Sequence, residues 1–277
     1  RLRLDAPQPD LSGWTKMVRR FKHPESGEAR IAVVGKYTNL VDSYKSIQEA
    51  LIHGGISNDV KVSVEWLSSE DFDGENHANL LKDFQGLLIP GGFGQRGIEG
   101  MLAAVRWSRV NEIPFFGICL GLQCAVIEFA RNVCNLEGSH STEFLEDASD
   151  PVICLLDSQR QVTKKGGTMR LGAYPCILGE GTRARDTYGT PEVSERHRHR
   201  FEVNNHYRDL LNDHGLTISG TSPDGALVEM VEITNHPWFV AGQFHPELKS
   251  RPTRPHPLFA SFIEAAAAYG QSSSVPE

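Results

Sequence analysis

The 277-residue sequence lacks several features that mark specialised classes of protein. No run approaches the roughly 20 apolar residues that a membrane-spanning helix needs, and the first residues do not have a signal-peptide pattern. A phosphate-binding loop of the GxxxxGK[ST] type is also absent, which excludes nucleotide hydrolysis by that device. The net charge of -7 argues against nucleic-acid binding as the main role. We therefore expect neither a membrane nor a nucleic acid as a partner.

Cysteines are scarce as well. The chain has five, none at CxxC spacing, so we expect neither a disulfide framework nor a zinc site. This usage favours a reducing, cytoplasmic location. Four of the five are predicted to be structural, although Cys124 lies close enough to Cys119 to be a second target of thiol reagents.

Patterns typical of strands and helices alternate along most of the chain. Because the helices are long enough to connect parallel strands, this order predicts an α/β fold with a doubly wound, mostly parallel sheet flanked by helices. Short β-like runs and glycines between residues 152 and 203 predict a small antiparallel extension at one edge of that sheet. Strands are expected at 31–35, 60–67, 86–90, 113–116, 216–220, 227–233 and 239–244, and helices at 43–52, 79–84, 98–110 and 257–269.

The two ends of the chain differ in composition from the middle. Residues 1–29 are polar and contain three prolines, with one apolar-periodic stretch from Trp14 to Phe21. We interpret them as a linker with one short helix that follows a domain outside this sequence. Residues 30–270 are predicted to form the main domain, and the serine-rich residues 271–277 to be disordered.

The Gly-Ile-Cys-Leu-Gly motif at 117–121 lies between a predicted buried strand and a helical pattern. A reactive residue between two glycines at such a junction is typical of a nucleophile elbow. The sulfur would lie near a helix N-terminus, where the dipole favours a thiolate. Cys119 is therefore a candidate nucleophile for attack on a carbonyl carbon. By itself, the motif is equally compatible with a small buried cysteine.

A cysteine nucleophile needs a base and a group that orients the base. His245 follows the apolar strand near 239–244, and the carboxylate of Glu247 could reach its imidazole. The carboxyl ends of parallel strands meet at one sheet edge, so we expect both residues beside Cys119. The Pro-Gly-Gly sequence at 90–92 ends another strand at this edge. The amides of Gly92 and Leu120 are the predicted oxyanion hole.

Together these segments resemble the class I, triad-type glutamine amidotransferases over roughly residues 30–270. Longer segments at 36–47, 92–97, 141–144, 166–172 and 195–204 resemble the CTP synthases within that family. The resemblance implies that Cys119 attacks the side-chain amide of L-glutamine, ammonia leaves, and His245 directs water onto the thioester. It also implies that Gly92, Leu120, Gln123, Glu143 and Arg200 bind glutamine, the last two through its α-ammonium and α-carboxylate.

In that family the ammonia passes to a separate N-terminal synthetase domain, which uses ATP and magnesium to convert UTP to CTP. The resemblance thus implies no cofactor in this chain, a synthetase domain as partner, and a homotetramer for the whole enzyme. It further implies that GTP is an allosteric activator, with residues 93–97 as its nearest contributors here.

Two alternatives remain open at the level of sequence. The chain could be a stand-alone γ-glutamyl hydrolase on the same fold, or a catalytically silent domain kept for assembly or allosteric binding. The Arg-His-Arg-His-Arg run at 196–200 could also suggest a metal site. We expect no metal there, because on a strand the arginines and histidines would face opposite sides and no further ligand completes a set.

Overall fold

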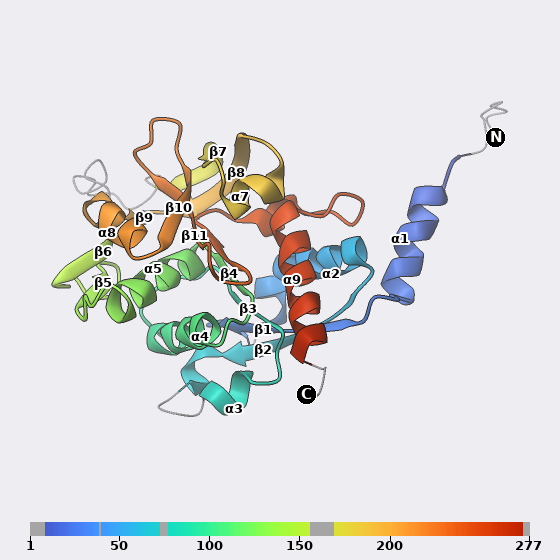
Figure 1. Cartoon of the computed structure of the whole chain (residues 1–277), viewed down its shortest axis with the longest axis horizontal. Helices are drawn as coiled ribbons and strands as arrows, with labels where there is room; N and C mark the ends of the chain where they lie inside the picture. The colour runs from blue at the N-terminus through green and yellow to red at the C-terminus, as the bar shows by residue number, and fades with distance from the viewer. Residues whose placement is uncertain (1–8, 39, 73–76, 156–168, 274–277) are drawn as a thin grey trace.

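A nine-stranded mixed sheet forms the centre of the protein (Figure 1). The computed structural model describes residues 9–38, 40–72, 77–155 and 169–273. The first five strands in sheet order run parallel to one another: β2 (Lys61–Ser68), β1 (Glu28–Gly35), β3 (Gly86–Ile89), β4 (Phe115–Ile118) and β12 (Phe239–Gly242). Antiparallel strands continue the sheet: β11 (Val228–Ile233), β10 (Leu216–Thr221), β7 (Arg170–Leu178) and β8 (Glu192–His199). The predicted α/β fold with an antiparallel extension is confirmed.

A second, three-stranded sheet lies beside the first, with β5 (Ser139–Ser141), β6 (Asp150–Leu155) and β9 (Phe201–Val203). The prediction that residues 152–203 all extend the main sheet is wrong for β6 and β9. Their apolar residues Val152, Ile153 and Val203 are buried in the core that contains the helix after β4. Burial against that helix, rather than pairing with β8, places these strands in a sheet of their own.

Helices cover both faces of the main sheet (Figure 1). Successive strand residues alternate between two apolar cores, so that Phe115 lies in one and Phe116 in the other. The Phe115 core contains α4 (Ile98–Val110), α5 (Leu120–Asn132) and α8 (Arg208–Asp213), and the Phe116 core contains α2 (Lys45–Asn58), α7 (Arg183–Tyr188) and α9 (Pro257–Ser273). The remaining short helices are α3 (His77–Leu81), η1 (Val41–Tyr44), η2 (Ser69–Asp71), η3 (Asn205–Tyr207) and η4 (Pro246–Lys249). None of the helices in the described ranges is long and apolar enough to span a membrane.

Helix α2 continues well past the predicted end at residue 52, through two glycines that normally weaken a helix. A Cβ on Gly54 would lie 2.7 Å from the carbonyl oxygen of Phe259 in α9, and one on Gly55 would lie 2.7 Å from that of Val60. The glycines therefore permit a close approach that outweighs their poor helix propensity. Helix α3 also differs from its prediction, beginning at His77 rather than 79 and ending at Leu81 rather than 84.

The predicted short helix near the N-terminus is α1 (Ser12–Lys22), which stands apart from the body of the protein (Figure 1). Arg20 donates to the carbonyl of Ser57 at the end of α2 (2.9 Å), while Trp14 and Phe21 on α1 are exposed. At the other end, α9 continues to Ser273. The prediction that disorder begins at residue 271 is therefore wrong for 271–273, and 274–277 lie outside the described residues.

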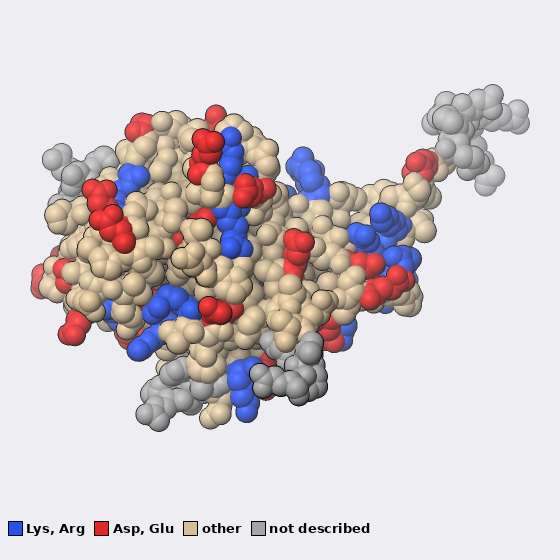
Figure 2. All heavy atoms as spheres, viewed as in Figure 1, with Lys and Arg blue, Asp and Glu red and all other residues tan. Residues whose placement is uncertain are grey.

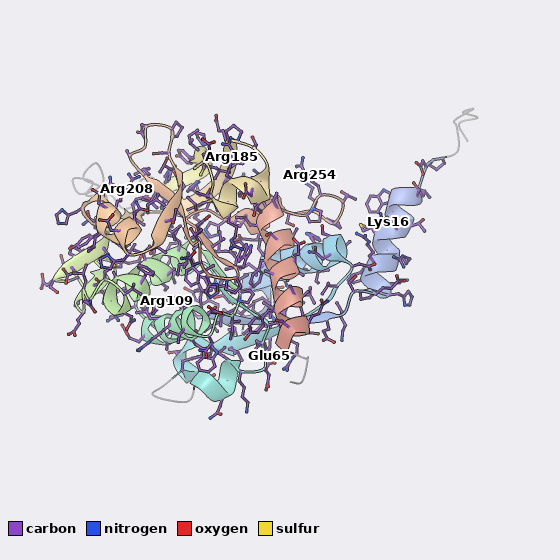
Figure 3. The ribbon with its side chains drawn as sticks, viewed as in Figure 1. Lys16, Glu65, Arg109, Arg185, Arg208 and Arg254 are labelled. Carbon is purple, nitrogen blue, oxygen red and sulfur yellow. The ribbon has the colours of Figure 1, made fainter. Side chains whose placement is uncertain are left out.

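Charged side chains of both signs are interspersed on the face in Figure 2, with no area of one sign alone among the described residues there. One of the largely buried ion pairs lies between α4 and α5. Arg109 of α4, labelled in Figure 3, donates through Nε (2.8 Å) and Nη2 (2.7 Å) to the carboxylate of Glu128 in α5. This bidentate pair joins the two helices on the side of the sheet that carries α5.

Candidate active site

Cys119 lies between β4 and α5, where the chain turns sharply from strand to helix. Its backbone has φ 53° and ψ -98°, a conformation that side-chain-bearing residues rarely adopt. The amide of Cys119 donates to the carbonyl of Gly242 at the end of β12 (2.8 Å), and only 3% of the residue is exposed. Strain of this kind costs on the order of 1–3 kcal/mol and is typical of functional sites. The sharp strand-to-helix turn that the sequence predicts at Cys119 is therefore present.

Both glycines of the motif are required by close contacts. A Cβ on Gly121 would lie 2.2 Å from the carbonyl oxygen of Ile89 in β3. A Cβ on Gly117 would lie 2.8 Å from the Cβ of Ala241 in β12 and 2.8 Å from the backbone of Gly121. No side chain fits at either position without moving backbone. The glycines thus let the elbow pack between β3 and β12.

His245 and Glu247 form the predicted pair beside the end of β12. The His245 Nδ1 lies 2.8 Å from Glu247 Oε1, and the His245 amide donates to the carbonyl of Arg196 in β8 (2.7 Å). Burial opposes a charge on the imidazole, but its interactions with Cys119 and Glu247 prevail and raise the pKa of His245 to about 10. An imidazolium held this way can donate a proton to a leaving group.

Gly91 lies close to both Cys119 and His245. A Cβ at this position would lie 2.8 Å from His245 Cε1 and 3.6 Å from Cys119 Cβ. The sequence analysis named the neighbouring Gly92, whose Cβ would meet the side chain of Leu120 at 3.1 Å. Leu120 is the first residue of α5, so its amide is among those that lack an acceptor within the helix. The loop at 91–92 and this helix end therefore flank the sulfur.

A cavity of about 950 Å³, here called the larger cavity, opens at Cys119. It brings together most of the predicted glutamine-binding residues, which come from four different parts of the chain. A smaller cavity of about 410 Å³ reaches Cys119 from the side of His245 and Glu247. The lining of the larger cavity includes Gly92, Gln123, Glu143 and Arg200, whereas Leu120 does not line it and lies buried beneath the loop.

Glu143 also holds the glycine-rich loop. Its Oε1 accepts a hydrogen bond from the amide of Gly94 (3.0 Å). The ammonium of Lys36 donates to the carbonyls of Phe93 (3.2 Å) and Gly94. Burial lowers the pKa of Lys36, although the nearby Glu143 opposes this effect. The loop is thus fixed from two sides. The sequence analysis included Lys36 in a family segment but gave it no role.

Gln243 is a second residue whose role sequence reasoning missed. It is fully buried, and its Nε2 lies 3.7 Å from the sulfur of Cys119. Its Oε1 accepts from Nε2 of Gln123 (3.4 Å), which fixes the orientation of the amide and turns the donor toward the sulfur. Gln123 also donates to the carbonyl of Phe201 (3.3 Å). Its position two residues before His245 was the one available signal in the sequence.

The run at 196–200 alternates as predicted. His197 and His199 are buried while Arg196 and Arg198 on the same strand are exposed. Across the part of the chain that the structure describes, no group of three or more metal-binding side chains is arranged to hold an ion. Arg200 follows the end of β8 and turns into the larger cavity. The five cysteines form no disulfide bond with one another, and Cys124 is fully buried.

Comparison with known proteins identifies this arrangement. Residues 39–265 match the glutamine amidotransferase class-I family. The chain belongs to this family. It is 55% identical to CTP synthase of Geotalea uraniireducens over 266 residues, which are 96% of this chain and 50% of that protein. It is also 55% identical to CTP synthase of Chlorobium phaeovibrioides, over 98% of this chain and 46% of that protein.

Among solved structures, the amidotransferase chain is similar to the CTPS glutaminase domain of Trypanosoma brucei, solved with bound acivicin. The TM-score is 0.82 and the identity 38%, over 87% of this chain and 94% of that one. The resemblance to the amidotransferase part of CTP synthases is therefore confirmed. The chain spans about half the length of the curated relatives that it matches.

Proposed function

We propose that this chain hydrolyses L-glutamine to L-glutamate and ammonia, as the glutaminase part of a CTP synthase. The observation that carries the proposal is the position of Cys119. Its sulfur lies in a strained elbow at the larger cavity, with Gln123, Glu143 and Arg200 in the lining, while His245 approaches from the other side. This arrangement can bind an amino acid by its charged groups and present its side-chain amide to a thiol.

The chemistry follows from these positions. The Cys119 sulfur, as thiolate, attacks the side-chain carbonyl carbon of glutamine, and the oxyanion that forms faces the amides of the 91–92 loop and of Leu120. The His245 imidazolium gives its proton to the amide nitrogen, the C–N bond breaks, and ammonia leaves a thioester behind. Neutral His245 then removes a proton from water as it attacks the thioester, which releases glutamate and restores the thiolate. Glu247 orients the imidazole throughout and stabilises its positive form.

Recognition of glutamine uses two opposite charges. The Glu143 carboxylate suits the α-ammonium group, and the Arg200 guanidinium suits the α-carboxylate through paired hydrogen bonds. Gln123 and the backbone at Gly92 and Leu120 are proposed to contact the amide end of the substrate. In this assignment Glu143 and Arg200, which line the larger cavity, both bind the substrate. Gln243 does not bind it and instead donates toward the sulfur of Cys119.

This chain corresponds to about half the length of each of the two CTP synthases compared above, so the reaction that consumes the ammonia is also a proposal. We infer that a synthetase domain in the same polypeptide consumes ammonia, with ATP and magnesium, to convert UTP to CTP in a tetrameric, cytoplasmic enzyme. GTP would act as activator near residues 93–97. No step of glutamine hydrolysis described above requires these groups.

The test combines activity with covalent labelling. Cys119→Ala is expected to abolish glutamate release and adduct formation with a chloroketone analogue of glutamine. Cys134→Ala, at another buried cysteine, is the matched control and should keep both. His245→Ala should lower the rate by about 10²- to 10⁴-fold, and Glu247→Gln should lower it less.

Several results would contradict the assignment. Turnover that survives Cys119→Ala would show that Cys119 is not the nucleophile. Equal rates for the His245, Glu247 and control variants would show that these residues do not form a catalytic triad with Cys119. An intact protein that binds glutamine without releasing glutamate would favour the silent assembly domain. Efficient hydrolysis of γ-glutamyl peptides in preference to glutamine would favour the stand-alone hydrolase.

A further inference from the structure

Four buried ionisable side chains and the largely buried Arg170, whose side chain is 9% exposed, form a cluster that the proposed reaction does not use: Arg170, His197, His199, Glu202 and Glu229. Arg170 donates through Nη2 to Glu229 Oε1 (2.5 Å), and its Nη1 lies 3.9 Å from Glu202 Oε1. His199 Nδ1 lies 3.4 Å from the same oxygen of Glu202. Burying so many ionisable groups is costly unless they are paired. The pairing therefore fixes the positions of the segments that carry these side chains.

The cluster spans the junction between the two sheets. Arg170 pairs with His199 in the register of β7 and β8 in the main sheet, whereas Glu202 pairs with Cys154 in the small sheet. A single residue, Arg200, connects β8 to β9. The contacts of Glu202 with Arg170 and His199 therefore cross from one sheet to the other directly beside the residue that turns into the larger cavity.

Hydrogen bonds within the cluster have a fixed direction. The carbonyl of Phe201 can only accept, so His199 Nδ1 (3.3 Å away) carries a hydrogen, and His199 Nε2 accepts from His197 Nδ1 (2.9 Å). His197 Nε2 then has no hydrogen and lies 3.7 Å from Glu229 Oε2. Both imidazoles are neutral, because burial and then Arg170 lower the pKa of His197 to about 2 and of His199 to about 3.

The carboxyl groups complete the charge balance. Burial raises the pKa of Glu202 to about 8, against the opposing effect of Arg170, and burial also raises the pKa of Glu229. At neutral pH the cluster thus contains one cation, Arg170, and at least one protonated carboxyl group. Arg170 is held further by the ring of Tyr174, 4.6 Å from its guanidinium carbon. Its position is therefore determined from both sheets at once.

We propose that Arg170 and Glu202 are positioning residues, which fix Arg200 in the larger cavity so that its guanidinium meets the α-carboxylate of glutamine. The proposal rests on the function proposed above for Arg200. It follows that loss of either residue weakens recognition of the carboxylate and leaves recognition of the rest of the substrate intact. A merely structural role for the cluster would weaken every ligand of the cavity alike.

The test measures binding without turnover, in a Cys119→Ala background. Isothermal calorimetry gives the Kd of L-glutamine and of L-glutaminamide, in which a neutral amide replaces the α-carboxylate. Arg170→Met and Glu202→Leu are expected to weaken L-glutamine about tenfold, because a charge-assisted hydrogen bond is misaligned. Both should change the Kd of L-glutaminamide by less than about twofold, and the conservative Glu202→Gln should keep most of the affinity for L-glutamine.

Two comparisons decide whether the effect passes through Arg200. Arg170→Met combined with Arg200→Met should bind L-glutamine no more weakly than Arg200→Met alone. Arg109→Met, which removes a largely buried ion pair away from the cavity, is the matched control and should leave both ligands unchanged. If Arg170→Met does not fold, Arg170→Lys, which lacks the guanidinium fork, should show the same selective loss to a smaller degree.

Equal weakening of both ligands, or additive effects in the double variant, would overturn the positioning role. The outcome also separates this inference from the proposed function. If Arg200→Met itself does not discriminate between the two ligands, the assignment of Arg200 to the carboxylate fails. If Arg200→Met discriminates and the Arg170 and Glu202 variants do not, only the positioning role fails.

Discussion

Replacing Gly121 by alanine tests how closely the nucleophile helix must approach the sheet. The new Cβ would lie 2.2 Å from the carbonyl oxygen of Ile89, which is 1.2 Å short of the 3.4 Å at which ordinary contacts begin. Neither atom is at the end of a flexible side chain, so α5 must move away from β3. The sulfur of Cys119, which directly precedes α5, would move with it.

The expected magnitudes follow from that displacement. Overpacking costs about 1–3 kcal/mol, and the better helix propensity of alanine offsets about 1 kcal/mol of this. The net loss is then about 0–2 kcal/mol, so the melting temperature should fall by no more than about 8 °C. A shift of roughly 1 Å in a reacting group costs on the order of 10²-fold in rate. We thus expect a large, roughly 10²-fold fall in the rate of Cys119 labelling together with only a small fall in melting temperature.

Labelling by the chloroketone analogue of glutamine, followed by mass spectrometry, gives the rate, and circular dichroism gives the melting temperature. Gly13→Ala is the matched control, because Gly13 lies on the exposed helix α1 and a Cβ there meets nothing within 4 Å. It should leave the rate unchanged and should not lower the melting temperature. A Gly121→Ala protein with the wild-type rate and stability would refute the argument from close approach.

Two further predictions concern titration of buried groups. Burial raises the pKa of Glu202 from 4.5 to about 8, so the folded state binds a proton that the unfolded state releases. Its contribution to the free energy of unfolding is then lost as pH rises from about 4.5 to about 8, at up to about 1.4 kcal/mol per pH unit. Glu202→Gln should flatten this decline in melting temperature, and parallel curves for the two proteins would contradict it. Burial likewise raises the pKa of Cys124 to about 12, so peptide mapping after alkylation of thiols at pH 8 should find an adduct at Cys119 but none at Cys124 until denaturant is added. An adduct at Cys124 in the folded protein would contradict this and would show that helix α5 opens locally.

The predictions that came from local pattern agree with the structure in the type and order of the main strands and helices, although the ends of α2, α3 and α9 differ. Buried strands and amphipathic helices are recognisable because each repeats its apolar residues at its own period. The elbow is recognisable because two close contacts leave room only for glycine at 117 and 121. His245 and Glu247 were found because parallel strands end at one sheet edge, which places the residues after β4 and β12 together.

Other features depend on contacts between distant segments, which a local pattern does not contain. Alternation in β8 predicts which side chains are buried, but it does not reveal that the chain leaves the main sheet at Arg200 and enters another. The hydrogen bond from Gly94 to Glu143 and the donor that Gln243 turns toward Cys119 join residues 49 and 124 positions apart. The sequence alone therefore determined the fold class and the strand ends that bring Cys119 and His245 to one sheet edge. The packing of α5 against both sheets determined the shape of the cavity, because only the folded chain brings those segments into contact.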